Sequence, residues 1–69
     1  MTFEVALKAM KCGVRAKRTS WPKKYVALNR ADEFMSNYLY MVNAAGDSMP
    51  WTPSQADLFA NDWELIPIV

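Results

Sequence analysis

This 69-residue chain has one cysteine and no histidine. The shortage of side chains for disulfides and metal binding is the feature that most constrains its fold. A chain this short buries a small core and usually depends on disulfides, a metal ion or oligomerisation. Cys12 has no partner for an intramolecular disulfide, and one cysteine without histidine does not make a structural zinc site. Oligomerisation is the remaining means of stabilisation. Cys12 itself is expected to be a reduced, small packing residue.

The same shortage argues against an enzyme. Without histidine, neither a Ser-His-Asp triad nor a Cys-His pair can form. Gly13 and Gly46 stand at predicted turns rather than in a phosphate loop, and the carboxylates show no metal-ligand spacing. We therefore predict no catalytic residue, no metal and no cofactor.

The sequence shows no sign of a membrane or of export. No apolar run approaches the roughly 20 residues that a membrane-spanning helix needs. The first residues have a helical pattern and lack the charged and apolar regions of a signal peptide. We expect a cytoplasmic protein with no membrane partner.

Charge is distributed unevenly along the chain. All eight lysines and arginines lie in the first thirty residues, where only Glu4 opposes them, for a net charge of +7. The later residues carry the other six acidic residues and no basic residue, for a net charge of −6. This split indicates an anionic partner for the first half. The alternative is that the two halves pair with each other, within one chain or between subunits.

An amphipathic helix is predicted over residues 3–12. Apolar residues recur there at i, i+3, i+4 and i+7, which is one helical stripe. The stripe consists of Phe3, Ala6, Leu7 and Met10. The Thr2 hydroxyl can cap the first turn, and Gly13 is placed to end the helix in the left-handed conformation.

Most of the remaining chain is typical of short strands. The predicted strands cover residues 14–18, 25–28, 38–42, 48–50 and 62–66. Loops are expected at 19–24 and 29–36, and a hairpin turn at 43–47. Ser54 and Asp57 have the spacing of a capping box, which predicts a short helix before the last strand. The order α-β-β-β-β-α-β predicts a single α+β domain over residues 1–69, a small antiparallel sheet packed by the N-terminal helix.

Basic and aromatic residues together suggest a binding site. Lys23 and Lys24 follow the basic strand 14–18 in the loop that carries Trp21. Basic side chains attract phosphate, and an indole offers a face on which a nucleobase stacks. In the alternative interpretation Trp21 is a core anchor and the basic residues form a solvated face. Periodicity does not distinguish the two.

The other aromatic residues are also open to two interpretations. Trp51 fits either a pocket or the core, whereas Trp63, in an alternating strand, is predicted to be core. Tyr38 and Tyr40 face the same side of their strand. They fit a ligand wall or a subunit interface.

Two stretches of the sequence carry the motifs of a known family. Residues 49–64, M-P-W-T-P-S-Q-A-D-L-F-A-N-D-W-E, contain the pattern P-W-x-P-S-Q-x-D-L-x-A-x-D-W. The N-terminal part contains F-x-x-A-L-x-x-x-x-x-G over residues 3–13 and R-x-x-W over residues 18–21. On these motifs the chain resembles the second type of Thoeris anti-defence protein, with closely related anti-CBASS sponges.

The resemblance implies a phage protein that evades immunity inside the bacterial host cell without catalysis. Such sponges bind a cyclic nucleotide second messenger, hold it intact and deprive the downstream effector of its activator. The ligand classes implied are cyclic ADP-ribose derivatives and cyclic dinucleotides, rather than polymeric nucleic acid. Family members resemble one another in forming homotetramers with pockets at subunit interfaces.

The resemblance also implies which residues contact the ligand. Trp21 is the candidate for base stacking, and Arg18 for a bidentate phosphate contact. The C-terminal motif adds Trp51, Ser54, Gln55 and Asp57. Gln55 suits a base edge or a ribose hydroxyl, while capping is the preferred role for Ser54 and Asp57. Lys23 and Lys24 are added on chemistry alone.

The central segment 29–37 is shorter than in typical family members, which leaves the identity of the ligand open. Two other functions also stay open. One is a small nucleic-acid-binding module that uses the basic half of the chain. The other is a protein–protein inhibitor that binds a host protein through an aromatic surface.

Overall fold

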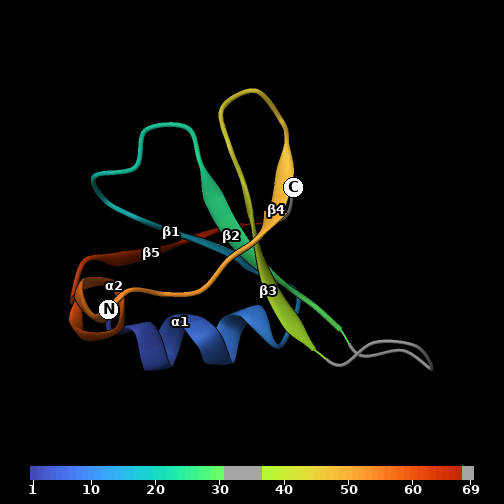
Figure 1. The fold of residues 1–69 in the computed structure, drawn as a ribbon. Coiled ribbons are helices and arrows are strands. Elements are labelled where there is room, and N and C mark those ends of the chain that lie inside the picture. Colours follow the sequence, from blue (N-terminus) through green and yellow to red (C-terminus); the bar gives the residue numbers. More distant parts are fainter. Residues whose placement is uncertain (31–36, 68–69) are drawn as a thin grey trace.

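The computed structural model describes residues 1–30 and 37–67 (Figure 1). The elements are α1 (Phe3–Met10), β1 (Arg15–Arg18), β2 (Tyr25–Asn29), β3 (Tyr38–Val42), β4 (Ser48–Pro50), α2 (Gln55–Phe59) and β5 (Trp63–Ile66). Their order is the predicted one. Most of the predicted loop 29–36, and most of the short segment 29–37 that bears on ligand choice, lies outside the described residues.

The strands form one antiparallel sheet in the order β4-β3-β2-β1-β5. α1 lies along one face and packs against β1 and β5, while α2 contacts α1 (Figure 1). This arrangement confirms the predicted α+β fold, and no strand boundary differs from its prediction by more than one residue. Neither helix of the described chain is long and apolar enough to cross a membrane.

Both ends of α1 are capped by the residues that the sequence indicates. Thr2 Oγ1 accepts a hydrogen bond from Val5 N at 3.4 Å. At the other end Gly13 has a φ of +94°. Gly13 N donates to Met10 O at 3.0 Å and Val14 N donates to Ala9 O at 3.2 Å, the hydrogen bonds of a Schellman motif. This motif ends the helix before the predicted residue 12.

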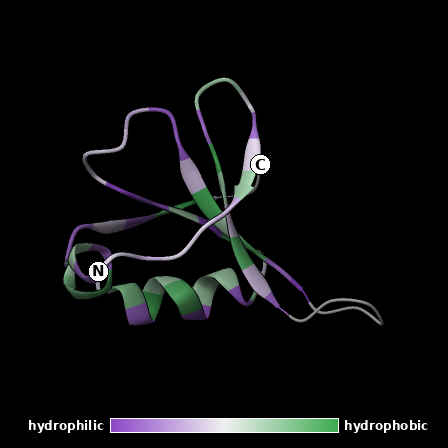
Figure 2. Cartoon of the chain, viewed as in Figure 1, coloured by the Kyte–Doolittle hydropathy of each residue, from purple (hydrophilic) through white to green (hydrophobic). Residues whose placement is uncertain are grey.

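The core lies between α1 and the sheet. Its buried residues are Phe3, Ala6, Met10, Ala16, Trp21, Val26 and Trp63. In Figure 2 hydrophobic and hydrophilic bands alternate along α1, as expected for a helix that buries one side. Trp63 is 2% exposed, so its predicted core position is confirmed. The packing role predicted for Cys12 is wrong, because the buried stripe ends at Met10 and Cys12 is exposed in the following turn.

Tyrosines gather on the face of the sheet away from α1. Val26 is buried in the core, so its neighbour Tyr25 points to the other face. The rings of Tyr38 and Tyr40 are 6.5 Å apart between centroids, which confirms that they share a side of β3. The Arg15 guanidinium lies 5.0 Å from the centroid of the Tyr25 ring, and its Nε is buried without a hydrogen-bond partner among the described residues. This face therefore carries aromatic rings and the Arg15 cation, which makes no ion pair with a described residue.

Candidate functional site

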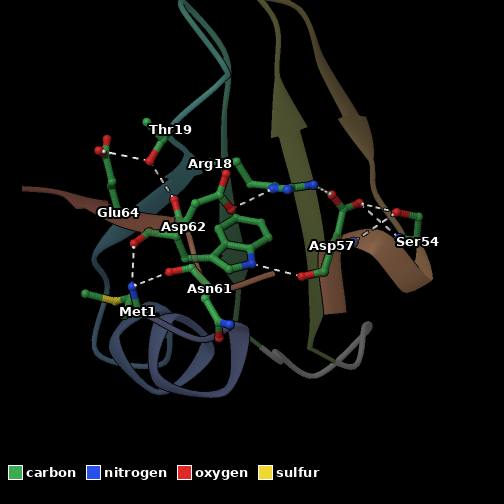
Figure 3. Close-up of polar contacts among 9 residues, drawn as sticks. Met1, Arg18, Thr19, Ser54, Asp57, Asn61, Asp62 and Glu64 are labelled. Atoms are coloured by element: carbon green, nitrogen blue, oxygen red, sulfur yellow. Dashed lines mark hydrogen bonds and ion pairs between the residues drawn. The ribbon is translucent and has the colours of Figure 1, made fainter. Parts of the chain in front are cut away.

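The basic and acidic halves of the chain meet where β1 pairs with β5. The strand register places Lys17 opposite Glu64, and Lys17 Nζ lies 3.7 Å from Glu64 Oε2. Arg18 Nε donates to Asp62 Oδ1 at 3.0 Å, and Arg18 Nη1 donates to Asp57 Oδ1 at 3.2 Å (Figure 3). Part of the charge split is thus used for pairing within the chain. Arg18 already has two carboxylate partners, so a ligand phosphate would have to compete with them.

The start of α2 is closed by the predicted capping box. Asp57 N donates to Ser54 Oγ at 3.1 Å, and Ser54 N donates to Asp57 Oδ2 at 3.0 Å. Asp57 thus holds Ser54 through one oxygen and Arg18 through the other (Figure 3). The predicted capping box is thus confirmed, and Asp57 pairs with Arg18 as well. Gln55 is exposed on the first turn and makes no side-chain hydrogen bond with a described residue.

The network shifts the ionisation of both partners. Burial alone raises the pKa of the Asp57 carboxyl. Hydrogen bonds from Ser54, and the hydrogen bond and charge of Arg18, outweigh burial and hold this pKa below its ordinary value. The hydrogen bond to Asp62 raises the pKa of the Arg18 guanidinium, against a smaller desolvation effect. Both groups are therefore charged at neutral pH.

We predict that Asp57 makes the fold acid-sensitive. A carboxyl whose pKa is lower in the folded state stabilises that state above its unfolded pKa of about 3.9. This stabilisation is present at neutral pH and is lost as the pH falls from about 5 through the lowered folded pKa. Urea unfolding between pH 7 and pH 3 measures the loss, and Asp57→Asn should flatten the profile. The control is Asp47→Asn, because Asp47 lies in a turn and makes no ion pair with a described residue. D47N should keep the pH profile of the wild type, whereas equal profiles for D57N and the wild type would contradict the prediction.

The tryptophans of the candidate site belong to an aromatic cluster. Trp63 lies 5.2 Å from Phe3, 5.4 Å from Trp21 and 6.1 Å from Trp51 between ring centroids. Trp21 is 9% exposed, and the Lys24 ammonium lies 4.7 Å from the centroid of its ring. The structure therefore places Trp21 in the core and Trp51 at its partly exposed edge. A base could stack on Trp21 only if Lys24 moved aside.

A pocket of about 230 Å³ lies at the end of the sheet where the β1–β2 loop approaches the β3–β4 turn. It is lined by Pro22, Lys23, Lys24, Asn43 and Ala44, and we call it the lysine pocket. Figure 1 shows these two connections side by side at one end of the sheet. The surface of the pocket is almost entirely apolar, so the polar ends of Lys23, Lys24 and Asn43 lie outside it.

The structure separates the predicted site residues into three places. Arg18, Ser54 and Asp57 form the ion-pair network, Trp21 and Trp51 belong to the core cluster, and Gln55 stands apart on the surface. Lys23 and Lys24 line the lysine pocket, and the contact of Lys24 with Trp21 joins the pocket to the cluster. In residues 1–30 and 37–67 no group of three or more cysteines and carboxylates is placed to hold a metal ion.

Sequence reasoning missed Pro22, Asn43 and Ala44 as pocket residues. A signal for them exists, because two connections at the same end of an antiparallel meander lie close together. The hairpin turn at 43–47 was predicted, but its position beside Lys24 requires the register Tyr25↔Val42. That register cannot be read from either strand alone.

Comparison with known protein families identifies a match. Residues 1–66 match the family described as Tad2-like, a Thoeris anti-defense 2-like domain. No curated protein matches the chain. The match spans both motif-bearing ends of the sequence and all seven helices and strands of the described residues.

Proposed function

Since the chain belongs to the Thoeris anti-defense 2-like (Tad2-like) family and is a phage-type Thoeris anti-defence protein, we propose that it is a sponge for a cyclic nucleotide. It binds the signal of a Thoeris or CBASS system, a cyclic ADP-ribose derivative or a cyclic dinucleotide, and holds it without cleavage. The effector is then deprived of its activator. This binding takes place in the cytoplasm of the infected bacterium.

The lysine pocket is the observation that carries this proposal. Its almost entirely apolar surface suits the flat face of a base. The side chains of Lys23 and Lys24 belong to its lining and carry positive charge that attracts phosphate. Neither lysine makes an ion pair with a described carboxylate, in contrast to Lys17 and Arg18, but a ligand would have to draw the Lys24 ammonium from the Trp21 ring.

The lining of the pocket supports binding rather than cleavage. Hydrolysis of a phosphodiester needs a general base, a nucleophile or a metal ion. The described lining residues offer two ammonium groups, one amide and apolar atoms, with no carboxylate, thiol or hydroxyl side chain. A ligand held there meets no catalytic partner among these residues.

We further propose that the sponge is a homotetramer with ligand pockets at its subunit interfaces. Its exposed apolar residues support a partner subunit, because Phe59 is 80% exposed and lies beside the exposed Leu58 on α2. Contiguous exposed apolar patches mark association sites. Light scattering coupled to size-exclusion chromatography measures the mass, and a monomer at micromolar concentration contradicts the tetramer.

The two alternative functions have less support. A nucleic-acid-binding module would use the basic half, but Lys17 and Arg18 are paired with Glu64, Asp57 and Asp62. A protein inhibitor would use an aromatic surface, which the exposed Phe59 also offers. Each alternative becomes the favoured interpretation if no cyclic nucleotide binds.

The test is sequestration followed by release. Purified protein is mixed with cyclic ADP-ribose isomers and cyclic dinucleotides, and the free fraction of each is quantified by chromatography before and after heat denaturation. We expect one nucleotide to disappear and to return intact on denaturation. Its return as a product would show an enzyme, and no depletion would contradict the proposal.

A further inference from the structure

Only the oxygen of the Asn43 side-chain amide forms hydrogen bonds within the β3–β4 turn. Its Oδ1 accepts hydrogen bonds from Ala45 N at 2.9 Å and from Asp47 N at 3.0 Å. Both acceptor positions of that oxygen are thus occupied, which fixes the orientation of the amide. The Nδ2 group has no hydrogen-bond partner among the described residues. Asn43 therefore offers two N–H donors and no free acceptor.

The strand register brings this donor next to Lys24. Tyr25 and Val42 are the last paired residues of β2 and β3 at this end of the sheet. One step further along the same antiparallel register, Lys24 and Asn43 stand across from each other, a position at which side chains are neighbours. Both residues line the lysine pocket, and the Lys24 ammonium lies 4.7 Å from the centroid of the Trp21 ring, outside the pocket lining.

We propose that Asn43 Nδ2 and the ammonium groups of Lys23 and Lys24 form a phosphate cradle at the lysine pocket. All three groups donate, so they match a ligand group that only accepts. An ionised phosphate is such a group, whereas a base edge often presents a donor beside an acceptor. The phosphate is that of the cyclic nucleotide, and to that extent the inference rests on the proposed function.

Two substitutions separate the donor of Asn43 from its role in the turn. Asn43→Ser removes Nδ2 without adding charge, and its hydroxyl can still accept from the turn N–H groups. Asn43→Asp keeps an oxygen for Ala45 N and Asp47 N and replaces the donor with a second acceptor. Ala45→Asp is the matched control, because it adds the same charge to the same turn outside the pocket lining.

The experiment titrates ¹⁵N-labelled protein with inorganic pyrophosphate and follows NMR shifts. In the wild type we expect the side-chain NH₂ signals of Asn43 to shift saturably, with the same Kd as the backbone signal of Lys24. N43S and N43D should weaken binding about tenfold or more, as for the loss of a charge-assisted hydrogen bond. A45D should stay within about threefold of the wild type. Unchanged backbone shifts of Ala45 and Asp47 in N43D establish that the turn is retained.

The outcomes distinguish the cradle from the sponge. Any of three results overturns the cradle. The first is that the wild type shows no saturable shifts. The second is that N43S and N43D bind within about threefold of the wild type, and the third is that A45D loses as much affinity as N43D. Cyclic nucleotide capture is then measured on the same proteins. If N43S captures the nucleotide as well as the wild type does, the cradle is overturned and the sponge is retained. If the protein binds pyrophosphate but captures no nucleotide, the sponge is overturned and the cradle is retained.

Discussion

The Trp63→Ala variant is expected to be unfolded at neutral pH. Trp63 is 2% exposed, packs against Phe3, Trp21 and Trp51, and donates its indole N–H to Asp57 O at 2.9 Å. Truncation of a buried tryptophan costs about 3–5 kcal/mol, and the unpaired carbonyl adds roughly 1–3 kcal/mol. A domain of this length has roughly 3–10 kcal/mol of total stability. Far-UV circular dichroism during urea unfolding should show no cooperative transition.

Trp63→Phe is the matched control for that experiment. It keeps an aromatic ring in the cluster but removes the N–H donor to Asp57 O. We expect a folded protein that is destabilised by about 2–4 kcal/mol, from the smaller ring and the lost hydrogen bond. A cooperative W63A transition near that of the wild type would show that the cluster is not the centre of the fold.

Reversal of both charges in the lysine pocket is expected to abolish ligand capture and to leave the fold intact. In Lys23→Glu/Lys24→Glu each substitution removes an attraction to phosphate and adds a repulsion. At about 4 Å in water each interaction is worth about 1 kcal/mol, so two reversals amount to roughly 4 kcal/mol, or about a thousandfold in Kd. The sequestration assay should find the nucleotide free in solution.

The control for this variant reverses two lysines elsewhere. Lys8 and Lys11 are exposed on and just after α1, outside the pocket lining, and Lys8→Glu/Lys11→Glu changes the net charge by the same amount. We expect this control to keep wild-type capture, apart from a weak effect that salt screens. Equal losses in the two double variants would indicate attraction by net charge rather than a site.

Local structure was predictable because its causes are local. The apolar spacing in α1, the Thr2 cap, the left-handed Gly13 and the Ser54–Asp57 box each depend on residues close in sequence. The sheet also followed, since short strands separated by turns form antiparallel meanders. The error at Cys12 has a local cause as well, because one residue past the buried stripe is enough to reach solvent.

The candidate site was less predictable because it depends on long-range contacts. Arg18 reads as a phosphate ligand from its motif, but its partners Asp57 and Asp62 lie 39 and 44 residues away. Trp21 fits stacking or burial equally well by periodicity, and only the packing of Trp51 and Trp63 places it in the core. Asn43 shows no chemical signal until the register sets it opposite Lys24.

The aromatic cluster gives the molecule an intrinsic optical reporter. All three tryptophans lie within 6.2 Å of one another between ring centroids, so their electronic transitions couple and their emission reports on a single environment. None of them lines the lysine pocket, and the cluster signal therefore follows unfolding. The Lys24 ammonium over the Trp21 ring is the one contact described here between a pocket residue and the cluster. A ligand that draws this cation from the ring alters the emission of one indole, so fluorescence can record occupancy without a label.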